Sequence, residues 1–206
     1  MQTTLSPDLA SRLRSATREL HAEVERTGVM ADLLAGRLSR PGFAGLLRNL
    51  HALYAALEPA LEGFGPLPVP PLQRTARLAE DLAVLHGPDW RIELPVAKAT
   101  DDYVARLHAL AARQAPELAA HAYVRYLGDL HGGQVLARLV AKRYGLQGDA
   151  GIRFYDFGDE ARVQRLREDL RGALVAMQPG EAAAEAIVEE ACWAFRQHAR
   201  LFRELA

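Results

Sequence analysis

The chain has 206 residues, of which 50% are hydrophobic, and a formal net charge of −1. This length is enough to fill one hydrophobic core, so we expect a single domain over 1–206 and a monomer. The balanced charge argues against nucleic acid as a partner, and the single cysteine excludes an internal disulfide and a cysteine-based zinc site. Charged residues interrupt the N-terminal segment and no long apolar run follows, so we expect no membrane anchor and a cytoplasmic protein.

Apolar residues recur at helical spacing along nearly the whole chain, which predicts an all-α fold of roughly seven or eight helices. Ser6 as an N-cap before Pro7 predicts a first helix that ends near residue 26. Further helices are predicted over 39–63, 72–85, from 95 onward, and over 116–144, 159–177 and 180–205. The proline-rich 65–71 and the glycine-rich 146–158 are predicted to be connections.

The predicted helix over 116–144 contains three glycines close together, although glycine weakens a helix. Gly128, Gly132 and Gly133 fall within one sector of about 140°, next to Arg125 and Asp129. A helix face without side chains lets a flat ligand approach the backbone closely. Tight packing against another helix, or a kink, explains the same glycines equally well.

The first predicted helix carries Arg14, Arg18, His21 and Glu25 at spacings of four, three and four residues, so all lie on one stripe. A neutral imidazole at the edge of the apolar face is able to ligate iron through one nitrogen. Glu25 is then placed to accept the N–H of the other nitrogen, and the two arginines are placed to meet carboxylates of the same ligand. A lone helical histidine is nevertheless more often a surface or core residue, and none of the seven histidines forms a zinc motif such as H-E-x-x-H.

Two segments carry a resemblance to a known family. Residues 121–136, HAYVRYLGDLHGGQVL, closely resemble the signature of the haem oxygenases. Residues 13–25, LRSATRELHAEVE, resemble the helix that carries this family's single haem ligand. The resemblance continues through 53–62, 80–90 and 187–205 and covers nearly the whole chain. It is specific, because two separated motifs agree with each other and with the expected order of helices.

The resemblance implies a single compact multi-helix domain, with haem sandwiched between a proximal helix and a kinked distal helix. His21 would be the axial metal ligand, with Glu25 as its hydrogen-bond partner. Asp129 would anchor a water network beside the iron, and Arg125 and Tyr54 would extend it. The other implied cofactor-binding residues are Gly128, Gly132 and Gly133 against the haem face, Arg14, Arg18, Tyr123, Arg165 and Arg171 at the propionates, and Phe195 as a pocket-lining aromatic.

One position departs from the family pattern. The signature usually has serine where this chain has His131. An imidazole there either tunes the distal water network or points outward.

The resemblance also implies the reaction. Haem b (iron protoporphyrin IX) would be both cofactor and substrate, and O₂ and electrons would convert it to biliverdin, Fe²⁺ and CO, with cleavage at the α-meso carbon. The sequence contains no flavin, nicotinamide or iron–sulfur motif, so the electron donor would be a separate ferredoxin or flavoprotein reductase. One alternative is a protein that stores or delivers haem without turnover. The other is a purely helical interaction domain, or a cofactor-free enzyme on a similar helical scaffold.

Overall fold

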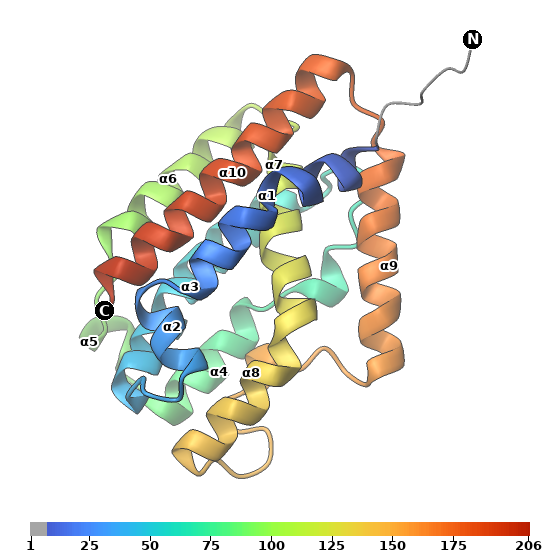
Figure 1. The fold of residues 1–206 in the computed structure, drawn as a ribbon. Helices are drawn as coiled ribbons and strands as arrows, with labels where there is room; N and C mark the ends of the chain where they lie inside the picture. The colour runs from blue at the N-terminus through green and yellow to red at the C-terminus, as the bar shows by residue number, and fades with distance from the viewer. Residues whose placement is uncertain (1–7) are drawn as a thin grey trace.

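The computed structural model describes residues 8–206, which fold into helices joined by turns and short loops (Figure 1). The predicted all-α class is confirmed. The described residues form α1 (Leu9–Glu25), α2 (Gly28–Leu34), α3 (Arg40–Leu61), η1 (Pro70–Leu72), α4 (Thr75–Leu85), α5 (Trp90–Glu93), α6 (Lys98–Ala112), α7 (Leu118–Ala122), η2 (Tyr123–Leu127), α8 (Gly128–Tyr144), η3 (Arg153–Tyr155), α9 (Glu160–Ala176) and α10 (Glu181–Glu204).

The long helices begin close to where the sequence predicts them. Ser39 caps α3, because its hydroxyl accepts a hydrogen bond from the backbone N–H of Gly42 at 3.1 Å. The first helix is an exception. The predicted cap, Ser6, lies outside the described residues, and Asp8 caps α1 by accepting from the N–H of Ser11 at 2.9 Å.

The number of helices differs from the prediction, since residues 8–206 contain ten α-helices. The periodicity does not predict α2 and α5, which have seven and four residues and are too short for a helical repeat to show. The helix predicted over 116–144 is divided by η2, a single π-helical turn of five residues. The π turn bends this helix, so we treat α7, η2 and α8 as one kinked helix.

Helices α1 and α10 lie side by side and run in the same direction (Figure 1). Two ion pairs mark their common direction: Arg12 and Glu181 meet at 2.9 Å near the two N-terminal ends, and Glu23 and Arg203 meet at 3.0 Å near the two C-terminal ends. Only Leu9, Leu13 and Thr17 are fully buried along α1. The other face of α1 is therefore free to form one wall of a cavity.

Gly28 fixes the turn that follows α1. Its φ of +47° is in the left-handed region, and a Cβ at this position would lie 1.9 Å from the backbone oxygen of Phe202 in α10. Glycine alone meets both conditions, because it has no Cβ. The chain is thereby held against the end of α10 as it enters α2.

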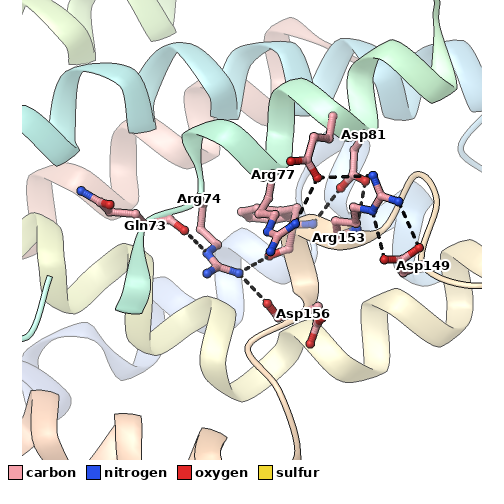
Figure 2. A network of polar contacts seen from close by, with 9 residues as sticks. Gln73, Arg74, Arg77, Asp81, Asp149, Arg153 and Asp156 are labelled. Atoms are coloured by element: carbon pink, nitrogen blue, oxygen red, sulfur yellow. Dashed lines mark hydrogen bonds and ion pairs between the residues drawn. The ribbon is translucent and has the colours of Figure 1, made fainter. Parts of the chain in front are cut away.

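The loop behind α8 is tied to α4 by the polar network drawn in Figure 2. The Asp81 carboxylate accepts from the backbone N–H groups of Arg153 at 2.9 Å and Phe154 at 2.7 Å. The Arg74 guanidinium donates to the backbone oxygen of Asp156 at 2.6 Å. These contacts hold Tyr155 of η3 against α8, where its ring packs beside Gly133.

None of the helices in residues 8–206 is both long and apolar enough to cross a lipid bilayer.

Candidate active site

A cavity with two adjoining lobes lies between α1 and the kinked helix. Each lobe has a volume of about 380 Å³. One lobe, here called the polar lobe, is bounded by basic and hydroxyl side chains. The other, here called the apolar lobe, is lined mainly by aliphatic and aromatic side chains. The residues that line both lobes are His21, Val124, Gly128, His131 and Phe195.

His21 stands on the α1 wall of both lobes. Its side chain is 53% exposed, and its ring packs edge-on against Phe195 with 5.9 Å between ring centroids. Nδ1 lies 3.8 Å from a carboxylate oxygen of Glu25, which is longer than a hydrogen bond. The imidazole is therefore available to a ligand in the cavity, with a carboxylate nearby.

Gly128 and Gly132 form the opposite wall. A Cβ added at either position would meet no atom within 4 Å apart from its own helix, so both face open space. Gly133 does not, because its Cβ direction points at the ring of Tyr155, 3.5 Å away. Residue 133 lies about 140° around the helix from residue 128, which turns Gly133 toward the protein interior, and its contact with the ligand stays a prediction.

Arg125 and Asp129 form a buried ion pair at the apolar lobe. Arg125 Nη2 donates to Asp129 Oδ1 at 2.8 Å, and the two side chains are 12% and 10% exposed. The Tyr54 hydroxyl, from α3, donates to the other carboxylate oxygen of Asp129. The structure thus brings together the three residues expected to form the catalytic group.

Burial shapes the charges of this pair. It raises the pKa of Asp129 above the usual carboxyl value, although Arg125 and the Tyr54 hydrogen bond oppose the rise. Burial, the largest single influence, would lower the pKa of Arg125, but Asp129, Tyr54 and Tyr103 together outweigh it and the pKa is raised. The arginine stays charged, and Asp129 holds a proton more readily than an exposed aspartate.

His198 joins this group and is not predicted from the sequence. Its Nδ1 lies 2.8 Å from the backbone oxygen of Ala194 and donates to it, so Nε2 accepts from Arg125 Nη1 at 3.2 Å. Burial and the Arg125 charge lower the pKa of His198 to about 3, so the ring is neutral. The only sequence signal is its position three residues after Phe195 on the apolar stripe of the last helix.

The polar lobe gathers Arg14, Arg18 and Arg171 with Tyr123. The Thr17 hydroxyl donates to the backbone oxygen of Leu13 at 2.8 Å, so its oxygen accepts from the Tyr123 hydroxyl at 3.1 Å. This hydrogen bond joins α1 to η2 at one end of the cavity. The lobe presents a concentration of positive charge suited to carboxylates.

Arg165 does not reach the cavity and is exposed on α9. Residues 165 and 171 are six apart, which separates them by about 120° around a helix, so they do not share a face. Arg167, which the sequence analysis does not single out, donates instead to the backbone oxygen of Leu130 and ties α9 to α8. Arg171 lines the polar lobe, whereas Arg165 lines neither lobe and its expected contact with the ligand stays a prediction.

The residues present fit a haem. The two glycines leave one wall bare, His21 of α1 lines the same cavity, and three arginines line the polar lobe. The Nε atom of Arg125 is buried without a hydrogen-bond partner among the described residues.

The fold and the site together define an all-helical protein with a two-lobed cavity between a histidine-bearing helix and a kinked, glycine-faced helix. A family model described as heme oxygenase matches residues 7–204. The chain belongs to the heme oxygenase family.

Relatives and solved structures agree. Human heme oxygenase 1 is 34% identical over 98% of this chain and 73% of its own length. Heme oxygenase 1 of Synechocystis is 34% identical over 98% of this chain and 86% of its own. The crystal structure of heme oxygenase-2 from Synechocystis, in complex with heme and NO, superposes with a TM-score of 0.91 at 35% identity, covering 97% of this chain and 85% of that one. Heme oxygenase from Leptospira interrogans superposes with a TM-score of 0.87 at 29% identity, covering 96% and 100%.

Proposed function

We propose that this protein is a haem oxygenase that binds haem b in the two-lobed cavity and converts it, with O₂ and electrons from an external donor, to biliverdin, Fe²⁺ and CO. The observation that carries the proposal is the opposition of His21 to the bare Gly128–Gly132 wall, with the buried Asp129 beside that wall. Bound haem supplies both the iron that activates O₂ and the ring that is cleaved.

His21 would hold the haem iron through its imidazole, and Glu25, with a carboxylate oxygen 3.8 Å from Nδ1, would orient the ring. The opposite wall offers no side chain beyond Cα at the two glycines, which leaves room for O₂ between that wall and the ligand. A protein that only stores haem does not need this space.

Asp129 holds water and a proton next to the bare wall. Its carboxylate is fixed on one side by Arg125 and on the other by Tyr54, so a water hydrogen-bonded to it has a defined position. Burial raises the pKa of Asp129, so its carboxylate takes up a proton more readily than an exposed aspartate does. The two fixed partners prevent the carboxylate from turning toward the metal and ligating it.

The arginines of the polar lobe bind the propionates and set the rotation of the ring in its plane. All three arginines line the polar lobe, so the propionate side of the ring would bind there. A fixed propionate side supports cleavage at one position, which we propose is the α-meso carbon. Chromatography of the product checks the assignment, and mainly β or δ biliverdin would contradict it.

The electron donor is a separate ferredoxin or flavoprotein reductase in this proposal. The proposed enzyme is a monomer whose described residues line both lobes.

Aerobic turnover tests the proposed function. The purified protein is loaded with one equivalent of ferric haem and given ascorbate or a ferredoxin system in air. We expect the Soret band to bleach and a bile pigment and CO to form. A stable complex that never bleaches would instead identify a protein that stores or delivers haem, and failure to bind haem would favour a helical interaction domain.

A further inference from the structure

His131 lies at the boundary between the two lobes. It belongs to α8, between Asp129 and the end of the glycine-faced wall, and its side chain contributes to the lining of both lobes. The His131 side chain is exposed, yet its ring has a partner on α8 and another on α9, and it makes no hydrogen bond to Asp129 in residues 8–206. Its expected effect on the distal water network stays a prediction.

Both ring nitrogens of His131 have partners. Nδ1 lies 2.6 Å from the backbone oxygen of Leu127, one turn earlier, and Nε2 lies 3.0 Å from Nη2 of Arg171 on α9. A carbonyl only accepts and a guanidinium only donates, so the ring must carry its proton on Nδ1 and accept at Nε2. Burial, together with Arg167 and Arg171, lowers the pKa of His131, which keeps Nε2 free to accept.

Arg171 has no other side-chain partner among the described residues. It is exposed on α9, and its long side chain would otherwise sample many rotamers. The bond to His131 occupies one of its N–H groups and leaves the others for a ligand. The bond also holds the guanidinium in the polar lobe, beside Arg14 and close enough to Tyr123 for both arginines to affect the tyrosine's pKa.

We propose that His131 is a positioning residue, which holds the Arg171 guanidinium at the edge of the polar lobe so that it binds a carboxylate of the tetrapyrrole. This inference rests on the proposed function. His131 thereby links α8, which faces the reacting side of the ring, to α9, which holds its carboxylate edge. The residue contributes to the in-plane orientation of the substrate without touching the iron, because its Nε2 is engaged by Arg171.

A comparison of two ligands tests this role. Ferric haem and its dimethyl ester differ only in the carboxylates, so their ratio of affinities isolates carboxylate recognition. Dissociation constants are measured by Soret titration for the wild type, His131→Ala, His131→Gln, Arg171→Ala and the double variant His131→Ala/Arg171→Ala. Arg165→Ala, on the same helix but away from the cavity, and His108→Ala, exposed on α6, are the matched controls.

We expect Arg171→Ala to weaken binding of the free acid by about tenfold and to leave the ester unchanged, as for loss of one partly exposed charged contact. His131→Ala should weaken binding of the free acid by most of the same factor. The double variant should bind the free acid no more weakly than Arg171→Ala does. His131→Gln should retain most of the affinity, since its amide is able to donate to Leu127 and accept from Arg171. The two controls should match the wild type.

A second measurement reads orientation directly. The hyperfine-shifted methyl resonances of bound ferric haem report its rotation in the plane, and His131→Ala should add a second set of resonances that His131→Gln does not. The proposal is overturned if His131→Ala binds the free acid as the wild type does, if it weakens both ligands equally, or if its effect adds to that of Arg171→Ala. Absence of haem binding by the wild type would overturn the proposed function itself and this inference with it.

Discussion

Arg125 and Asp129 form an ion pair 2.8 Å long across the junction of η2 and α8, and each has one further side-chain partner from a different helix. Tyr54 of α3 donates to Asp129, and His198 of α10 accepts from Arg125. Helices α3 and α10 and the kinked helix, which are distant in the sequence, therefore converge on one ion pair.

Gly132→Leu separates ligand binding from folding. Its Cβ points into open space, so the leucine fits the unliganded fold and fills the cavity. We expect unfolding stability to be unchanged or higher by about 0.5–1 kcal/mol, since glycine is a poor helix former, and haem affinity to fall by about tenfold or more. Gly172→Leu, also open but exposed on α9, is the control that should keep full affinity. Normal Soret titration of Gly132→Leu would show that this wall does not face the ligand.

His21→Ala should remove the proximal nitrogen while the polar lobe still holds the ligand. We expect the native ferric spectrum and turnover to be lost, and exogenous imidazole to restore the spectrum, because the deletion leaves space for it in the α1 wall. Resonance Raman and electron paramagnetic resonance spectra report the coordination. Unchanged coordination in the variant would reject His21 as the ligand.

Asp129→Ala should bind haem with nearly wild-type affinity, because His21 and the polar lobe are untouched. We expect biliverdin formation to fall by about 10²–10⁴-fold, the range for loss of a placed proton-transfer group. Asp129→Asn should be as impaired if the charge is required, and less impaired if water placement alone suffices. Single-turnover rates give the comparison, and a wild-type rate in Asp129→Ala would show that another residue organises the water.

His198 gives the protein a pH-dependent stability. Its pKa is about 3 when folded and 6.5 when unfolded, so between these values the unfolded chain binds the extra proton. The contribution of neutral His198 to the free energy of unfolding is complete above pH 6.5. As the pH falls below this value, the contribution decreases by roughly 1.4 kcal/mol per pH unit. His198→Asn removes this titration and keeps an oxygen able to accept from Arg125. The free energy of unfolding, measured with urea near pH 7 and near pH 5, should fall less between these pH values in the variant than in the wild type. Equal falls in the two proteins would contradict the assignment.

The sequence by itself determined the elements whose signals are local. Caps and periodicity place the long helices, since hydrogen bonds and side-chain spacing within a helix involve residues three or four apart. The same spacing puts His21 beside Glu25 and Arg125 beside Asp129. The signature over 121–136 identified the family, because a long motif constrains many positions together.

The tertiary structure alone decided which side chains meet. Gly133 packs against Tyr155 and Arg165 misses the cavity because a helix rotates by about 100° per residue, so the usable face depends on where the neighbouring helices lie. Tyr54 reaches Asp129 over a separation of 75 residues, and Arg125 reaches His198 over 73. The bond between Arg171 and His131 also joins two helices, and only their packing brings a donor to the free nitrogen of the ring.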